Sequence, residues 1–219
     1  MNVSLRVLAY DALKKAIMEM DIYGTSGEIR LDERRLSQDL GVSRTPIREA
    51  ITLLEQEGFV RSVPRRGIFV VRKTKTELIE TITVWAALES MAARLACEQA
   101  TAKDIVALRQ LFDEVPPETD AATAHVHEYS QANLAFHQAL MRLGGNRLII
   151  DLGQNLILHM RAIRAVSVRQ ERRLETSMRE HRGIIEALER RDADEAERLV
   201  REHTLGLAAH VERYGVFPD

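Results

Sequence analysis

A single glycine separates two stretches of helical periodicity in the N-terminal third of the chain. The first stretch, residues 32–40, is predicted to be a helix that ends at Gly41, because glycine tolerates the positive φ of a helix C-cap. Ser43 is predicted to cap the second helix, whose first turn tolerates Pro46 because N–H groups there have no intrahelical partner. This succession of helix, short turn and helix is typical of a helix-turn-helix motif.

The segments around this motif complete a small winged domain. Apolar residues recur at helical spacing over residues 5–17 and predict a preceding amphipathic helix. After the motif, residues 58–63 and 68–71 have the composition of two short strands around a basic turn at residues 64–67. Such a hairpin is a wing, and we predict a winged helix-turn-helix domain over residues 1–72.

The pattern changes to helices alone after the wing. No strand pattern is found in residues 73–219, where apolar residues recur at helical spacing between short breaks. Thr101 and Asp104 have the spacing of a capping box. Six helices are predicted, over residues 75–100, 102–114, 121–143, 146–168, 170–190 and 192–213. The fold class is therefore mostly α, with an all-α antiparallel bundle over residues 73–219.

Composition and charge exclude some classes of protein. Of the 219 residues, 45% are hydrophobic, which is enough to bury a core. Residues 1–72 carry 12 Lys/Arg against 10 Asp/Glu, a net charge of +2, and residues 73–219 carry 19 against 23, a net charge of -4. So small an asymmetry excludes a generally basic protein that coats nucleic acid, and it fits local phosphate contacts on the first domain.

The sequence also bears on location. No run of 18 apolar residues occurs, and Asp11, Lys14 and Lys15 interrupt the segment where a signal peptide would need its apolar stretch. We therefore expect a cytoplasmic protein. Cys97 is the single cysteine and is expected to be a small core residue.

Two arginines on the second helix of the motif are candidates for reading DNA bases. Arg44 and Arg48 are four residues apart, so one helical face carries two guanidinium groups that can bind guanine O6 and N7 or clamp phosphate. Thr45 and the N–H groups of the first turn add phosphate donors. The alternative is that these arginines only solvate an exposed helix.

The segment LDERRLSQDLGVSRTPIREAITLLEQEGFVRSVPRRGIFV resembles the winged helix of the GntR superfamily of transcription regulators. The resemblance implies that the cap, both arginines of the second helix and the wing tip contact an operator. A glycine at the wing tip would let the backbone approach the minor groove. The expected DNA-binding residues are Arg34, Ser43, Arg44, Thr45, Arg48, Arg66 and Gly67.

Histidines on separate predicted helices are candidates for a metal site. Asn133 and His137 lie four residues apart on one helix, and His181 and His203 lie on two later helices that a bundle could bring together. Sequence spacing alone leaves open that these are isolated surface or core residues.

The C-terminal region resembles the FCD ligand-binding domain of the FadR branch, and six helices point to its VanR-like subgroup. This resemblance implies one metal ion held by an Asp and three histidines, at positions that fall on Asn133, His137, His181 and His203. Here Asn replaces the Asp, so the site lacks an anionic ligand. Three imidazoles favour zinc, nickel or another borderline divalent transition metal, and the alternative is a histidine-lined polar cavity without metal.

Three further residues are candidates for binding an effector. The FCD domain usually has an Arg-x-x-Leu-Glu signature, and Trp85 stands in this chain where the signature has arginine. If Trp85 faces the cavity, the effector depends less on a carboxylate clamp and is larger or flatter; otherwise Trp85 is core or dimer packing. Arg161 and Arg164 could supply positive charge to an acidic effector, or lie at the surface.

Together these features predict a dimeric regulator, most simply a repressor, that binds an inverted-repeat operator in double-stranded DNA and responds to an organic acid or related metabolite. Its remaining histidines, His125, His127, His159 and His210, are assigned to surface or packing. We expect no enzymatic activity. The alternatives are a metal-dependent hydrolase fused to a DNA-binding module, with Glu180 beside His181 as its base, and an architectural DNA-binding protein without an effector.

Overall fold

A computed structural model describes residues 4–24, 27–113, 122–167 and 171–217. The chain divides into two compact units, Met1–Lys73 and Thr74–Asp219. Each unit is described by itself.

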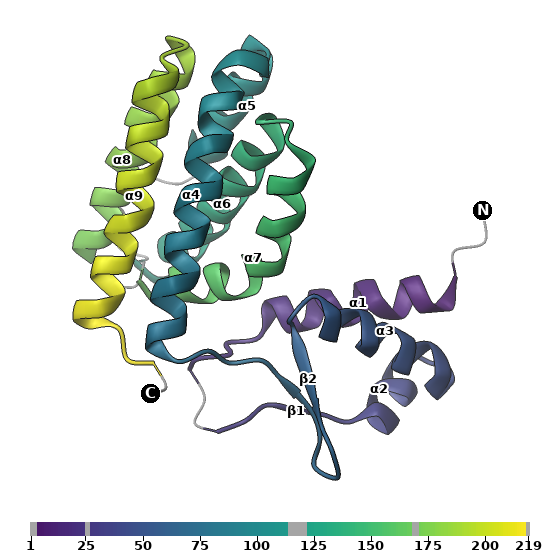
Figure 1. The fold of residues 1–219 in the computed structure, drawn as a ribbon. Coiled ribbons are helices and arrows are strands. Elements are labelled where there is room, and N and C mark those ends of the chain that lie inside the picture. Colours follow the sequence, from purple (N-terminus) through teal and green to yellow (C-terminus); the bar gives the residue numbers. More distant parts are fainter. Residues whose placement is uncertain (1–3, 25–26, 114–121, 168–170, 218–219) are drawn as a thin grey trace. The chain divides into compact units, whose positions relative to one another are not determined.

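The N-terminal unit packs three helices beside a three-stranded antiparallel sheet (Figure 1). Its elements are α1 (Leu5–Glu19), β1 (Arg30–Leu31), α2 (Glu33–Asp39), α3 (Arg44–Gln56), β2 (Val60–Val63) and β3 (Gly67–Val70). The strand order is β1-β3-β2, so β3 lies in the middle. Sequence patterns did not predict β1, because two residues are too few to show the period of a strand.

Capping contacts and one glycine define the ends of the helices in the helix-turn-helix motif, with one difference from the prediction. Asp32 caps α2 by accepting hydrogen bonds from the backbone N–H groups of Arg34 and Arg35, at 2.8 and 3.1 Å. Gly41 has the predicted positive φ, +64°. The predicted side-chain cap at Ser43 is wrong, because Ser43 occupies the N-cap position of α3 without making a side-chain cap hydrogen bond. A physical reason is Pro46, which stands at the third helical position and has no N–H to donate.

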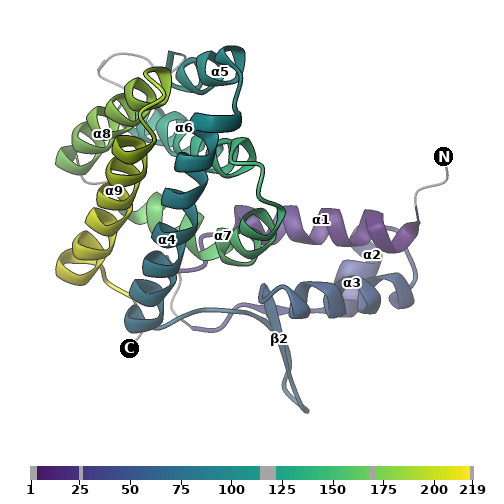
Figure 2. The ribbon, with the colours of Figure 1, turned by 45° about the horizontal axis from the view of Figure 1, so that its top comes forward.

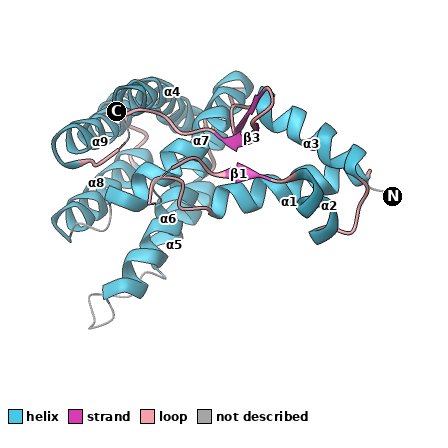
Figure 3. Cartoon of the chain, turned by 90° about the horizontal axis from the view of Figure 1, so that it is seen from below, coloured by secondary structure: helices cyan, strands magenta, loops and turns pink. Residues whose placement is uncertain are grey.

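In the described residues of the C-terminal unit, helices are the one kind of regular secondary structure (Figures 1 and 2). Seen from below, its described elements of secondary structure are helices, and the strands belong to the N-terminal unit (Figure 3). The helices are α4 (Lys75–Gln99), α5 (Ala102–Asp113), α6 (Ala122–Leu143), α7 (Arg147–Ser167), α8 (Glu171–Glu189) and α9 (Ala193–Tyr214). Every end of these helices lies within one residue of its predicted position, and the predicted ends at residues 114, 121, 168 and 170 lie outside the described residues. None of the helices in the described ranges has both the length and the apolar character needed to cross a membrane.

A capping box starts α5, as predicted. Thr101 Oγ1 accepts a hydrogen bond from the Asp104 N–H at 3.2 Å, and the Asp104 carboxylate accepts one from the Thr101 N–H at 2.9 Å. The two bonds satisfy donors that would otherwise lack a partner at the helix start. The break between α4 and α5 is therefore fixed by local sequence.

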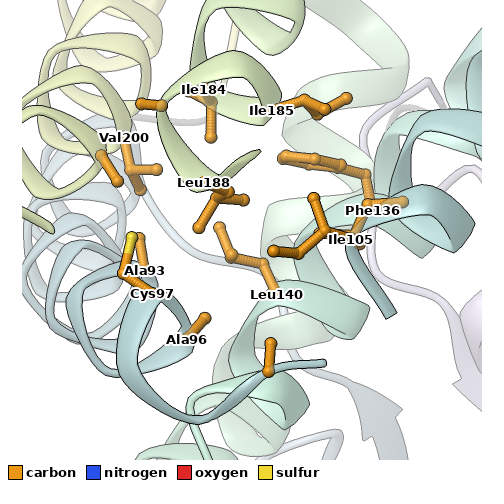
Figure 4. Packing of buried hydrophobic residues seen from close by; sticks show 14 residues of the cluster. Ala93, Ala96, Cys97, Ile105, Phe136, Leu140, Ile184, Ile185, Leu188 and Val200 are labelled. Atoms are coloured by element: carbon orange, nitrogen blue, oxygen red, sulfur yellow. The ribbon is translucent and has the colours of Figure 1, made fainter. Parts of the chain in front are cut away.

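Small residues on α4 let the other helices pack closely around it. α4 contacts α6, α7, α8 and α9, and its Ala93, Ala96 and Cys97 face the main hydrophobic core (Figure 4). The larger core residues come from the surrounding helices: Ile105, Phe136, Leu140, Ile184, Ile185, Leu188 and Val200. Burial raises the pKa of the Cys97 thiol, which fits its predicted role in packing.

Gly144 lies directly against the backbone of α4. A Cβ atom added at Gly144 would lie 2.7 Å from the Ala92 carbonyl oxygen and 2.9 Å from the Ala92 Cα. Both are backbone atoms, which cannot relieve the contact by a change of rotamer as a side chain can. We predict that Gly144→Ala lowers the free energy of unfolding by about 1–3 kcal/mol through overpacking, measured as a lower midpoint in calorimetry.

Gly183→Ala is the matched control. The nearest atom to its added Cβ, Leu199 Cδ1, is at an ordinary 3.9 Å, and Gly183 lies within α8. Alanine there should stabilise by about 0.5–1 kcal/mol, because glycine loses more backbone freedom in a helix. Equal effects of the two substitutions would contradict the proposed close packing at Gly144.

Candidate DNA-binding groove and metal centre

An open groove of about 680 Å³ lies between α2, α3 and the β2–β3 hairpin. Six arginines line it: Arg30, Arg34, Arg44, Arg48, Arg65 and Arg66. Of the seven residues predicted to bind DNA, five line the groove, namely Arg34, Arg44, Arg48, Arg66 and Gly67. The other two, Ser43 and Thr45, are exposed at the start of α3.

Two of these arginines share one carboxylate oxygen. Arg44 Nη2 and Arg48 Nε each donate to Glu33 Oε2 at 3.0 Å. Partial burial acts to raise the pKa of Glu33, but the hydrogen bonds and charges of the two arginines lower it overall. Glu33 therefore stays ionised at neutral pH.

The wing holds its own arginines in a similar way. Glu28 pairs with Arg61 and, at 2.5 Å, with Arg66, and both guanidinium groups lie over the Phe69 ring, 5.6 and 5.4 Å from its centroid. Gly67 has a φ of +116°. The structure thus fixes the direction of the wing arginines before any partner binds.

Sequence patterns missed Arg30, which belongs to β1. A Cβ atom at Gly67 would lie 2.9 Å from Arg30 Nε, so this guanidinium occupies the space beside the glycine. No periodic signal marked Arg30, because the two-residue strand that carries it has none. Packing against Arg30 therefore also explains why position 67 is a glycine, besides the predicted approach of the backbone to DNA.

Three buried histidines converge in the C-terminal unit. His137 of α6, His181 of α8 and His203 of α9 offer ligand atoms that all lie within 4.8 Å of one another. The Nε2 atoms of His137 and His181 are 3.2 Å apart. The bundle thus brings together three of the four residues predicted to bind metal.

An oxygen-bearing side chain orients the Nδ1 atom of each histidine. His137 Nδ1 is hydrogen-bonded to Glu89, His181 Nδ1 to the Tyr129 hydroxyl at 2.9 Å, and His203 Nδ1 to Glu180 Oε2 at 2.7 Å. Because the Tyr129 hydroxyl donates its proton to Ser177 at 2.7 Å, it accepts from His181. Oxygen partners on the second ring nitrogen are typical of histidines that bind metal through the first.

Asn133, the fourth predicted ligand, is buried beside Arg164. Asn133 Oδ1 accepts a hydrogen bond from Arg164 Nη1 at 3.0 Å. Arg164 also lies 4.0 Å from Glu89 and 5.9 Å from the centre of the Trp85 ring. The oxygen that would bind a cation therefore already faces a cationic group.

The side chains predicted to bind an effector differ in burial. Arg164 is 4% exposed, so the alternative that it lies at the surface is wrong. Trp85 is 1% exposed, and Arg161 is half-buried one turn before Arg164 on α7. Arg164 and Trp85 thus lie against the Glu89 side of the histidine cluster.

Glu89 is a buried acid that sequence reasoning did not single out as a site residue. Burial raises its pKa to about 7, although the charge of Arg164 and a 2.9 Å hydrogen bond from Thr204 act to lower it. Tyr129 was missed as well, although residues 129, 133 and 137 have a four-residue spacing that places them on one face of α6. Glu180, the base of the hydrolase alternative, makes an orienting contact to His203.

Comparison with known proteins assigns both units to known families. Residues 6–70 match the model of bacterial regulatory proteins of the gntR family, and residues 80–206 match the FCD domain. The chain belongs to the GntR family, in its FCD branch. This GntR-family chain is 30% identical over 196 residues to the uncharacterized HTH-type transcriptional regulator YdhC of Bacillus subtilis (strain 168), covering 89% of this chain and 85% of that protein.

Further relatives agree with this assignment. The HTH-type transcriptional repressor RspR of Escherichia coli (strain K12) is 27% identical over 173 residues, which cover 79% of this chain and 75% of RspR. The fold is that of E. coli McbR/YncC, with a TM-score of 0.77 at 22% identity over 97% of this chain and 100% of that structure. Members of this family are transcription regulators, and the winged helix-turn-helix is their DNA-binding unit. The VanR-like subgroup stays a prediction.

The Arg164–Glu89 contact predicts a coupled effect on stability. Arg164→Met should lower the free energy of unfolding by about 1–3 kcal/mol, because the buried carboxyl of Glu89 loses its nearest cation and, with a pKa already at about 7, takes up a proton instead. The double variant Arg164→Met/Glu89→Gln should recover part of this loss, and chemical denaturation with a chelator present measures both. If the double variant lost at least as much free energy of unfolding as Arg164→Met alone, the two side chains would not interact.

Proposed function

We propose that this chain is a dimeric transcription repressor whose operator binding is controlled by an organic acid bound at a metal centre in the FCD domain. The observation that supports a metal centre is the arrangement that its three histidines share. Each has an oxygen partner at Nδ1, which makes Nε2 the ligand atom that each ring would offer. This donor set fits zinc, nickel or another borderline divalent ion.

The ligands in this proposal are His137, His181 and His203, and the predicted role of Asn133 changes. A cation bound to Asn133 Oδ1 would share that oxygen with the guanidinium of Arg164, which is electrostatically unfavourable. Asn133 then serves to position Arg164. When bound, the metal ion supplies a Lewis acid with coordination positions left for oxygen atoms of an effector.

Positive charge on α7 supports an anionic effector. Arg164 is buried beside the histidines, and Arg161 lies three residues earlier on the same helix face. Trp85 adds an aromatic surface next to Arg164. A small organic acid fits these groups, with its carboxylate toward Arg164 and a planar or apolar part toward Trp85.

The first test is metal content. His137→Ala, His181→Ala and His203→Ala should each lower the metal bound per chain in elemental analysis, with His210→Ala, a half-buried histidine of α9, as the control. Tyr129→Phe keeps all three ligands and removes only the oxygen that orients His181. It should weaken metal binding by about 10- to 100-fold in competition with a chromophoric chelator. Unchanged metal content in all three alanine variants would mean that the histidines form no metal centre.

The groove supports base reading by α3. In this proposal Arg44 and Arg48 contact base edges, and the other predicted residues, Arg34, Ser43, Thr45, Arg66 and Gly67, contact the phosphate backbone or the minor groove. Since Pro46 removes the N–H that the Ser43 side chain would cap, the Ser43 hydroxyl is suited to a phosphate. Two such domains in a dimer would bind an inverted repeat with half-sites about 34 Å apart.

Exposed apolar residues support homodimerisation through the helical unit. Val84 and Met91 of α4 are 52% and 42% exposed, and Leu148 and Leu152 of the neighbouring α7 are 66% and 44% exposed. Apolar side chains of this size on adjacent helices are typical of a surface that a partner covers. Light scattering should give twice the chain mass of 24.9 kDa, and a value of one chain mass would contradict the dimer.

Base reading is tested with Arg48→Ala. This variant should weaken binding to a duplex selected by the wild-type protein from a random library and relax base preference at one position. The matched control is Arg35→Ala, since Arg35 is exposed on α2, pairs with Asp39 and does not line the groove. An equal loss of affinity for all sequences would assign Arg48 to the phosphate backbone instead.

A further inference from the structure

Glu33 links the two arginines of α3 that line the groove. One carboxylate oxygen accepts from Arg44 Nη2 and from Arg48 Nε, both at 3.0 Å. The Glu33 side chain is 23% exposed, whereas the side chains of Arg44 and Arg48 are 56% and 62% exposed. A half-buried acid thus lies behind two exposed guanidinium groups.

The contact matters because the two arginines would otherwise repel each other. Residues four apart on a helix are neighbours, so Arg44 and Arg48 place like charges side by side. Each also has many rotamers, and selecting one of them reduces the free energy available for binding. Glu33 neutralises part of the charge and holds both side chains by hydrogen bonds that leave further N–H donors on each guanidinium.

We propose that Glu33 is a positioning residue that sets the base selectivity of the groove by holding Arg44 and Arg48 in the geometry that reads DNA. This inference rests on the proposed function, in which these two arginines contact bases. Glu33 itself touches no base. Its contribution is to the ratio between specific and nonspecific binding.

A carboxylate in this place has opposite effects on the two kinds of binding. Nonspecific binding depends on phosphate charge, which a nearby anion weakens. Specific binding depends on directed hydrogen bonds to base edges, which fixed guanidinium groups strengthen. Loss of Glu33 should therefore lower specific affinity while nonspecific affinity stays level or rises.

The experiment compares two duplexes at one salt concentration, with the full-length protein. One duplex is selected by the wild-type protein from a random library, and the other is a scrambled sequence of equal length and composition. Glu33→Gln should weaken binding to the selected duplex by about tenfold and leave binding to the scrambled duplex unchanged or tighter. Equal losses on both duplexes, or gains on both, would overturn the positioning role.

Two further variants separate position from charge. Glu33→Asp keeps the charge and withdraws the carboxylate by one methylene. Its binding to the selected duplex should weaken as in Glu33→Gln, while its binding to the scrambled duplex stays at the wild-type level. Wild-type selectivity in Glu33→Asp would overturn the proposal. Glu55→Gln removes a charge from the same groove, but the Glu55 carboxylate accepts from Ser62 N and Oγ, at 2.6 and 3.0 Å. This control should keep the wild-type selectivity ratio. A double variant Arg44→Ala/Arg48→Ala that still binds the selected duplex at wild-type affinity would instead refute the proposed function, and the role of Glu33 with it.

Discussion

Close packing around α4 is the constraint on which the C-terminal unit depends. Its alanines let α9, α6, α7 and α8 approach the same helix, and Gly144 allows the chain to turn directly against the Ala92 backbone. The same helix carries Trp85 and Glu89 on the part that meets the polar cluster. Because α4 is held from several sides, Glu89 is fixed at His137 and Thr204, and the histidines of three other helices are brought to one place.

Charge balance follows from this packing. A buried carboxyl is costly unless a cation or hydrogen-bond donors surround it. Arg164 and Thr204 do this for Glu89, and Arg164 also donates to Asn133. An aspartate at position 133 would pair with Arg164 and add another carboxylate beside Glu89 and Glu180. The amide at that position is thus consistent with a site in which the fourth position beside the histidines holds the partner of an arginine and not a fourth protein ligand.

Much of the fold could be predicted from local signals. Helix periodicity, the glycine turn and the capping box at Thr101 give the helix bounds, because each depends on neighbouring residues. The site was only partly predictable, since its orienting contacts join residues distant in sequence: His137 with Glu89 is 48 residues apart, and Tyr129 with His181 is 52. Periodicity could not decide between the surface and the interior for Arg164, because burial of an arginine depends on partners contributed by other helices.

Both candidate sites orient a basic group by placing an oxygen atom behind it. Glu33 holds Arg44 and Arg48 in the groove, and Glu89, Tyr129 and Glu180 hold the three histidines in the bundle. The surroundings decide what the oriented group can bind. At the exposed groove, guanidinium groups keep their charge and suit phosphates and base edges. In the buried cluster, imidazoles directed by Nδ1 contacts suit a metal ion, so the same kind of contact supports two different kinds of recognition.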